Sequence, residues 1–511
     1  MRSRHFLEYR LSVEIRPDEL SQALHETFQV CGKARRVLQF YDSFDWRLHK
    51  AGLTLELEKS GRKTRLLCLR RKDGTIVTAT PFEQTAMPQF VGAFQDPDLR
   101  ARLTPILDVR ALLPQIEIIC EGTDFSSPQT DLIGICLADC RVASTDANLG
   151  TWLLAECQGK PSKALEELTA SLSFTSLSLE SLLNQALAAI QSKPPQVSPR
   201  PPIDPALRAD SASKAILKRL VVTMEMNRPG VMARTDSEFL HDFRVAVRRT
   251  RAALGQLKGV FGETSVRRYI SGFAWLGQLT GPARDLEVLL LNFDELKGQL
   301  PLSLRGGLDP LQRHVEAQLD RAYGQLILNL NSSRYASMIR GWQWFLDRAP
   351  ASRPRALHAL TPIDALASQR IQKVFRRALK QGRAINKDSP PADLHDLRKT
   401  CKKLRYLLEF FETLYPAAPF RQLLKQLKDL QNHLGEFQDI HAQIHMLCRM
   451  ADELRQQRSV PTQTFLALGA LIGQLEKRQT RLRKTFTDAF EQFSKAENRA
   501  LLQDLLAATA A

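Results

Sequence analysis

Two segments of this chain repeat one arrangement, a histidine followed by evenly spaced cations. HDFRVAVRRTR runs from residue 241 to 251, and HDLRKTCKKLR runs from 395 to 405. On a helix of about 100° per residue, the histidine and the cations three, seven and ten positions later share an arc of roughly 80°. Cations stacked in this way repel one another unless an anion lies between them. The spacing therefore predicts two helix faces that bind a ligand with many negative charges.

No acidic residue interrupts either face, because none falls between Asp242 and Glu263 or between Asp396 and Glu409. Arginine offers a planar fork of donors and lysine a point charge, and both suit successive phosphates. The predicted binding residues are His241, Arg244, Arg248, Arg249, Arg251, His395, Arg398, Lys402, Lys403 and Arg405. Cations that could extend the surface are Lys218, Lys373, Arg376, Arg377, Arg421, Lys425 and Lys428.

The repeat continues beyond the basic faces at the same offset of 154 residues. WLGQLTGPARDLEV at 275–288 corresponds to DLQNHLGEFQDIHA at 429–442, so that Gly281 matches Gly435 and Asp285 matches Asp439. We interpret the glycines as helix-end or close-packing positions. The aspartates are isolated carboxylates, so we predict that they orient the basic side chains or cap a helix, and each histidine either binds the anion or forms a hydrogen bond with its aspartate. The pattern indicates no catalytic residue, no metal site and no cofactor.

Net charge separates the chain into two parts. Of 72 Lys+Arg and 55 Asp+Glu, residues 1–190 hold 22 and 24, a net of −2. The remaining 50 and 31 give residues 191–511 a net of +19, which predicts a polyanionic partner for that part alone. Aromatic residues do not interleave with the cations on the two faces, which disfavours single-stranded nucleic acid as the partner.

The elements that must carry these residues differ between the two parts. Alternating segments such as LTLELE at 53–58 and IEIIC at 116–120 predict strands, and thus an α+β domain over 1–191. A proline-rich linker follows at 192–205. Apolar residues at helical spacing then predict two all-α bundles, over 206–350 and 351–511. The absence of a signal-peptide pattern and of an 18-residue apolar run predicts a cytoplasmic protein.

The two basic segments and the LG-x-x-x-D stretch ending at Asp439 resemble the CHAD family, the conserved-histidine α-helical domains. The resemblance covers about residues 206–490. It implies two helical bundles related by pseudo-twofold symmetry, polyphosphate as the ligand, and an association with polyphosphate or storage granules.

The stretch YDSFDWRLHKAGLTLELE at 41–58 is similar to the CYTH family, the triphosphate tunnel fold, whose members form an antiparallel β-barrel. This chain departs from that pattern, because Glu56 and Glu58 replace phosphate-gripping arginines and Leu154 replaces a carboxylate near Glu156. Anions in place of cations repel a triphosphate, so we expect a degenerate domain without triphosphatase activity.

We therefore predict a non-catalytic protein that binds inorganic polyphosphate. Two alternatives stay open at this point. One is a divergent Mg²⁺-dependent triphosphatase that uses Glu8 and Glu156, and the other is a binder of RNA or of an acidic protein.

Overall fold

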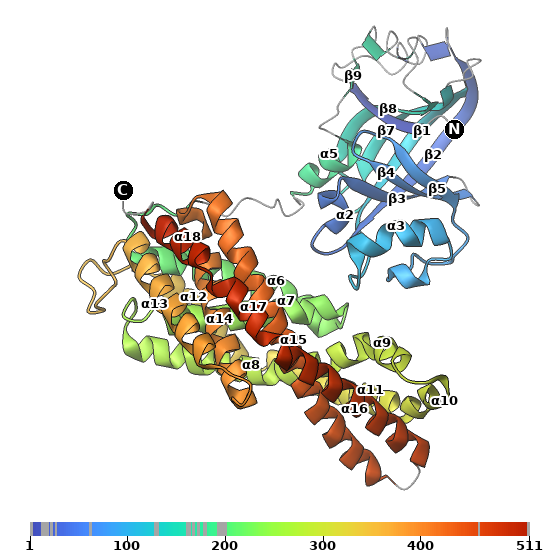
Figure 1. Ribbon diagram of the computed structural model, residues 1–511. Coiled ribbons are helices and arrows are strands. Elements are labelled where there is room, and N and C mark those ends of the chain that lie inside the picture. The colour runs from blue at the N-terminus through green and yellow to red at the C-terminus, as the bar shows by residue number, and fades with distance from the viewer. Residues whose placement is uncertain are drawn as a thin grey trace. The chain divides into compact units, whose positions relative to one another are not determined.

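The chain forms two compact units, residues 1–198 and residues 199–511, in the computed structural model (Figure 1). The structure describes residues 4–11, 20, 24–25, 28–60, 64–126, 132–159, 165, 169–170, 174–176, 181–191, 202–457 and 460–507. Most of the predicted linker, 192–201, therefore lies outside the described residues.

The first unit is built on a nine-stranded sheet in which every pairing is antiparallel. Its strands lie in the order β5-β4-β3-β2-β6-β7-β8-β1-β9. They are β1 (Arg4–Leu11), β2 (Gln29–Asp42), β3 (Leu53–Ser60), β4 (Thr64–Arg71), β5 (Ile76–Pro81), β6 (Leu113–Ser126), β7 (Leu132–Val142), β8 (Asn148–Gln158) and β9 (Phe174–Ser176). The strands predicted at 53–58 and 116–120 are thus confirmed within β3 and β6.

The sheet curls until β1 approaches the turn that precedes β5. The backbone N–H of Phe6 donates to the carbonyl of Gly74 over 2.8 Å, and His5 forms an isolated bridge with Thr75. Gly74 has a φ of +83°, and a Cβ at this position would come within 2.3 Å of the Phe6 carbonyl oxygen, so only glycine fits there.

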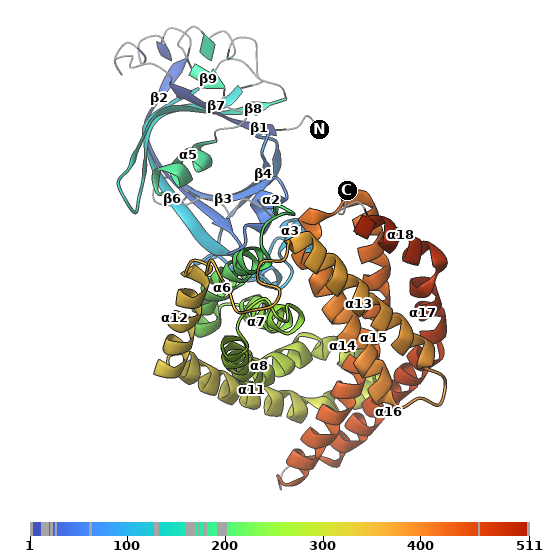
Figure 2. The ribbon, with the colours of Figure 1, turned by 90° about the vertical axis from the view of Figure 1, so that its left-hand side faces the viewer.

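Helix α5 (Leu182–Ala189) lies inside this curve (Figure 2). Its buried residues Leu182, Leu183, Ala186 and Leu187 share one core cluster with side chains of β2, β6, β7 and β8. Alternate residues of a strand face the same side of the sheet. Leu38 and Phe40 of β2 therefore belong to this cluster, and the residue between them does not. The helix therefore fills part of the sheet's interior with apolar side chains.

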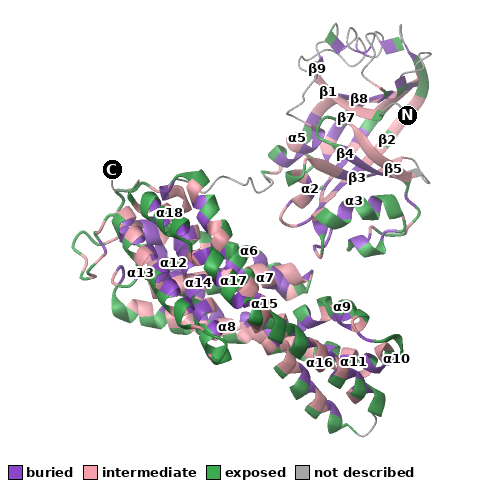
Figure 3. Cartoon of the chain, viewed as in Figure 1, coloured by how far each residue is buried: buried purple, intermediate pink, exposed green. Residues whose placement is uncertain are grey.

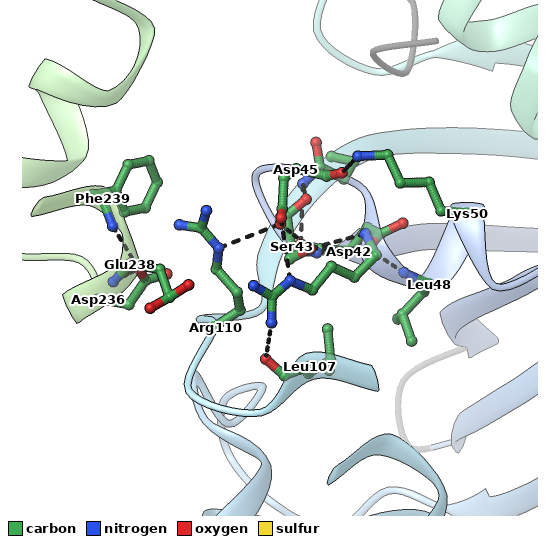
Figure 4. A network of polar contacts seen from close by, with 12 residues as sticks. Asp42, Ser43, Asp45, Leu48, Lys50, Leu107, Arg110, Asp236, Glu238 and Phe239 are labelled. Carbon is green, nitrogen blue, oxygen red and sulfur yellow. Dashed lines mark hydrogen bonds and ion pairs between the residues drawn. The ribbon is translucent and has the colours of Figure 1, made fainter. Parts of the chain in front are cut away.

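Two further helices, α2 (Arg47–Lys50) and α3 (Pro97–Leu107), belong to the first unit. The buried Asp42 carboxylate fixes the start of α2, since it accepts backbone N–H bonds from Ser43, Leu48 and His49 over 2.7–2.9 Å (Figure 4). Burial nevertheless raises the pKa of Asp42 to about 6.

The second unit consists of helices. They are α6 (Ala209–Ala233), α7 (Ser237–Gln256), α8 (Glu263–Leu291), α9 (Phe293–Gly298), α10 (Leu302–Arg305), α11 (Asp309–Leu330), α12 (Ser333–Asp347), α13 (Ile363–Ala384), α14 (Pro391–Phe410), α15 (Ala417–Arg455), α16 (Thr462–Lys484), α17 (Phe486–Ser494) and α18 (Ala496–Ala507). Their apolar faces turn toward one another and their exposed faces outward (Figure 3). The predicted fold class, an α+β unit with an antiparallel sheet before an all-helical part, is confirmed.

The helices that carry the two basic segments, α7 and α14, contact each other, and each packs on the helix that follows it, α8 or α15. A separate core cluster joins the ends of α8 and α15 with α9, α11 and α16. No helix among the described residues is long and apolar enough to cross a membrane.

Candidate functional site

Both basic segments lie on single helices, as their spacing predicts. Helix α7 begins after Asp236, whose carboxylate accepts the backbone N–H groups of Glu238 at 2.9 Å and Phe239 at 3.2 Å (Figure 4). Helix α14 begins with Pro391 at its first position, where the missing N–H costs no hydrogen bond.

The apolar side of each basic helix is buried, which fixes where the cations point. In α7 and just beyond it the buried stripe is Phe243, Thr250, Leu254, Leu257 and Phe261. In α14 and just beyond it the stripe is Leu397, Leu404, Leu408, Phe411 and Tyr415. The cationic arc of each helix therefore faces away from the core, and its side chains are half-buried or exposed.

In the second repeat the cations line a cavity of about 500 Å³ between α9, α14, α15 and α16. Its charged wall comprises Glu295 of α9, Arg398, Lys402 and Arg405 of α14, Glu436 and Asp439 of α15, and Arg478 of α16. Two carboxylates hold arginines in place here, because Asp439 lies 2.9 Å from Arg398 and Glu436 lies 2.6 Å from Arg478. An aspartate that orients a basic side chain must contact it, and Asp439 contacts Arg398 in this way.

Lys402 differs from the cations around it because it makes no hydrogen bond or ion pair with the described residues. It is half-buried, and burial together with the charges of Arg398, Arg248 and Arg405 lowers its pKa to about 8, although the Asp439 carboxylate opposes this shift. A cation that is partly desolvated among like charges is stabilised by any anion that enters the cavity.

In the first repeat, Arg244 and Arg248 form hydrogen bonds with neutral groups. Arg244 donates to the Thr280 hydroxyl at 3.0 Å, and its guanidinium lies beside Gly281. Arg398 lies beside Gly435 in the same way in the second repeat. A Cβ on either glycine would meet these guanidinium groups at 3.6 Å, an ordinary contact, so the arginines do not require glycine at these positions. The close-packing role of the glycine pair stays a prediction.

The two rows of cations approach each other where α7 contacts α14. The Arg248 guanidinium donates to the Tyr406 hydroxyl over 2.6 Å, so a side chain of one repeat is positioned by the other. The charges of Arg248 and Lys402 lie close enough to influence each other. The rows therefore do not lie on opposite outer sides of the helical unit.

One expectation about these rows needs correction, because carboxylates relieve the repulsion at both ends of the α14 row. Asp439 pairs with Arg398, and Glu409 pairs with Arg405 over 2.6 Å and also forms a short ion pair with Arg249. Glu409 follows the basic segment in the sequence, but one helical turn beyond Arg405 brings it onto the same face. Arg249, Arg398 and Arg405 thus offer a ligand less charge than the sequence predicts.

The two histidines have different surroundings. The Nδ1 of His241 lies 3.2 Å from Arg284, and burial together with this guanidinium lowers the pKa of His241. Its partner is thus Arg284 rather than the predicted Asp285. His395 is half-buried beside His441 and Asp396, whose titrations it affects. Neither histidine lines the 500 Å³ cavity.

The other predicted cations lie on helix surfaces. Arg251 packs over Gly277, and Lys403 is half-buried. The extension residues Lys218, Lys373, Arg376, Arg377, Arg421, Lys425 and Lys428 are exposed, and none lines the cavity. Lys218 pairs with Asp347 at 2.8 Å.

The interior of the first unit shows the opposite balance of charge. Arg70 is buried between Glu8 at 2.5 Å and Glu56 at 2.9 Å, and Arg36 bonds Glu58 at 3.2 Å and Asp124 at 2.7 Å. A cavity of about 240 Å³ beside these pairs is lined by Arg36, Glu56, Glu58 and Glu156. Burial raises the pKa of Glu56 to about 7, and the Arg70 charge opposes this shift. Glu56 and Glu58 thus line the interior, as expected from their position in the CYTH-like pattern.

Sequence reasoning missed three contributors to these arrangements. Arg478 lies outside the repeated segments, whereas Arg284 lies within one of them, directly before the repeated Asp285. Tyr406 falls about 20° from His395 on the helical wheel, so the basic arc of α14 does carry one aromatic residue, contrary to the expectation above.

Residues 215–448 match the CHAD domain family, which confirms the resemblance predicted from the repeated segments. Uncharacterized proteins from two strains of Mycobacterium tuberculosis are 26% identical over 247 residues. That alignment takes 47% of this chain and only 44% of the relatives, so the chain spans less than half of their length.

Solved structures resemble each unit separately. The CHAD domain from the plant Ricinus communis is 26% identical, with a TM-score of 0.47, over 60% of this chain and 94% of that chain. A putative adenylyl cyclase from Hippeastrum, described as having a dominant triphosphatase activity, is 14% identical, with a TM-score of 0.26. That alignment covers 38% of this chain and 98% of the Hippeastrum chain.

Proposed function

We propose that residues 215–448, which match the CHAD domain family, bind inorganic polyphosphate without catalysing a reaction. The observation that carries the proposal is Lys402, a half-buried cation that makes no ion pair with the described residues and that feels more cationic than anionic charge, since Arg398, Arg248 and Arg405 oppose its proton and Asp439 favours it. A chain of phosphates supplies successive negative charges at short intervals, so it can neutralise this group and its neighbours together.

The geometry supports a ligand that crosses from one repeat to the other. Arg244 and Arg248 belong to α7, whereas Arg398 and Lys402 belong to α14, and the charges of Arg248 and Lys402 interact. A linear polyanion can contact both pairs at once, whereas a single phosphate cannot reach all of them. Long chains should therefore bind more tightly than orthophosphate.

The test is a binding isotherm of the full chain with long-chain polyphosphate over a series of salt concentrations. Replacing Arg244, Arg248, Arg398 and Lys402 together by Ala should weaken binding by about 100-fold or more and flatten the salt dependence, because fewer counterions are released. The matched control replaces Lys33, Arg71, Lys72 and Arg100, four exposed cations of the first unit, by Ala. It removes the same charge and should leave affinity nearly unchanged.

Two outcomes would contradict the proposal. Equal losses in both quadruple variants would mean that net charge alone attracts the ligand. Tighter binding of RNA than of polyphosphate at the same ionic strength would favour the nucleic-acid alternative.

We also infer that the first unit does not hydrolyse triphosphate. Its interior arginines, Arg36 and Arg70, each bond two carboxylates, and α5 occupies part of the concave side. Phosphate release from tripolyphosphate with Mg²⁺ should therefore stay at the level of a protein-free blank. Turnover that disappears in Glu8→Gln or Glu156→Gln would overturn this inference and establish the enzyme.

A further inference from the structure

Helix α15 carries a row of metal-ligating residue types that the polyphosphate proposal does not use. His441, His445, Cys448 and Asp452 stand at positions i, i+4, i+7 and i+11, which fall within an arc of about 60°. His441 is half-buried, and the other three are exposed. The row thus follows one solvent-reachable side of the helix.

The two histidines at the start of the row face each other. Their ring centroids lie 4.5 Å apart, and the rings are nearly perpendicular at 81°. Neither ring forms a hydrogen bond with the described residues. Their nitrogen lone pairs are therefore not committed to another group of the described chain.

Packing within the helical unit does not account for this pair of histidines. The corresponding position of the first repeat holds Glu287, which is buried and hydrogen-bonded to Tyr323 and Arg284. His441 in the second repeat takes part in no such network, and its neighbour His445 is exposed. The pair thus does not continue a packing arrangement common to both copies.

We propose that His441 and His445 bind a divalent transition-metal ion, such as Zn²⁺, Ni²⁺ or Cu²⁺. Imidazoles four residues apart on a helix present two nitrogens to one ion, as in helical metal sites with this spacing. No three His, Cys, Asp or Glu side chains of the described residues are grouped to hold a metal. The protein accordingly supplies two ligands, and water fills the remaining positions.

The protonation state of His441 favours metal binding near neutral pH. Burial lowers the pKa of His441, and the neighbouring His445 and His395 lower it further. A metal needs the neutral imidazole, so little proton release accompanies binding at pH 7. Binding should weaken below about pH 6, where protons compete for the same nitrogens.

The test titrates the full chain with Mn²⁺, Ni²⁺, Cu²⁺ and Zn²⁺ by calorimetry, without polyphosphate. Affinity should be weakest for Mn²⁺ and strongest for Cu²⁺, the order that nitrogen ligands impose. His441→Ala and His445→Ala should each weaken binding by about tenfold or more. Cys448→Ser tests whether the thiolate contributes to metal binding in addition to the imidazoles. His49→Ala, in the first unit, is the matched control for the loss of a histidine. The Cys448→Ser and His49→Ala variants should both bind metal as the wild type does.

An unchanged isotherm in both α15 histidine variants would overturn the proposal, and so would a loss in Cys448→Ser as large as theirs. Far-UV circular dichroism checks that α15 stays helical in each variant. Because polyphosphate is absent from the titration, failure here leaves the polyphosphate proposal standing, and the reverse also holds.

Discussion

The two units of this chain hold buried and half-buried cations in opposite ways. In the curled sheet, Arg70 lies between Glu8 and Glu56, and its charge is matched inside the protein. In the helical unit, the charge of Lys402 is opposed by Arg248, Arg398 and Arg405 and favoured by Asp439, and no ion pair with the described residues neutralises it. The difference teaches that the balance of charge around a cation, rather than the number of cations, indicates where an anion can bind.

The same comparison distinguishes cations that stabilise the fold from cations that are available to bind a ligand. A fully paired buried cation stabilises the fold only as part of its pair, because removing one partner leaves uncompensated charge. A cation among like charges opposes the fold slightly and is retained at a cost in stability. The three predictions that follow test this difference.

The largest effect is expected from Arg70→Met in the first unit. The arginine side chain is 6% exposed, and its loss leaves Glu8 and Glu56 facing each other in the interior. We expect the unfolding free energy of this unit to fall by about 3–5 kcal/mol. Urea unfolding of the full chain, followed by circular dichroism, measures the change in the transition of the first unit.

The matched variant in the helical unit is Lys402→Met, which removes a cation without leaving a carboxylate unpaired. It should leave the unfolding free energy of ligand-free protein unchanged or slightly higher. If Lys402→Met destabilised its unit as much as Arg70→Met destabilises the other, the proposed contrast between the two units would be wrong.

A smaller effect is expected from pH, again at Lys402. Its pKa is lowered from 10.5 to about 8 in the folded protein. Between these values the unfolded chain holds more protons, so this group makes the ligand-free protein more stable as pH rises from 8 to 10.5. Polyphosphate prefers the charged lysine, so its affinity should fall by about tenfold between pH 7 and pH 9.

Lys402→Arg is the control for this pH dependence, since a guanidinium keeps its proton throughout the range. Its polyphosphate affinity should vary less over pH 7–9 than that of the wild type. Calorimetry in two buffers of different ionisation enthalpy measures how many protons the protein takes up when polyphosphate binds. Near pH 8 this number should exceed zero for the wild type only. An equal pH dependence in both proteins would assign the titration to another group.

Much of the helical unit could be predicted because its information is periodic and duplicated. The spacing of Leu397, Leu404 and Leu408 defines the buried side of α14, and the position of Arg398 and Lys402 on the other arc follows from the same wheel. The repeat also located Gly281 and Gly435, whose contact with arginines depends only on neighbouring helices.

The sequence could not predict which group pairs with each charged side chain. Glu409 meets Arg249 because α7 and α14 contact each other, and no spacing within one segment reveals that contact, whereas the pair of Glu409 with Arg405 follows from the i,i+4 spacing within α14. Arg70 likewise meets Glu8 across a sheet that curls, with 62 residues between them. The position of α5 inside that curve depends on the same long-range packing.

The smallest effect is expected at His241, although its segment resembles that of His395 closely. Burial and Arg284 lower the pKa of His241, so the ring is neutral at pH 7 and adds no charge for an anion. His241→Asn keeps a polar group beside Arg284, and we expect polyphosphate affinity within about twofold of the wild type, well under 1 kcal/mol. Arg244→Gln, one turn along the same helix, should weaken binding more. A larger loss from His241→Asn than from Arg244→Gln would show that the histidine itself contacts the ligand.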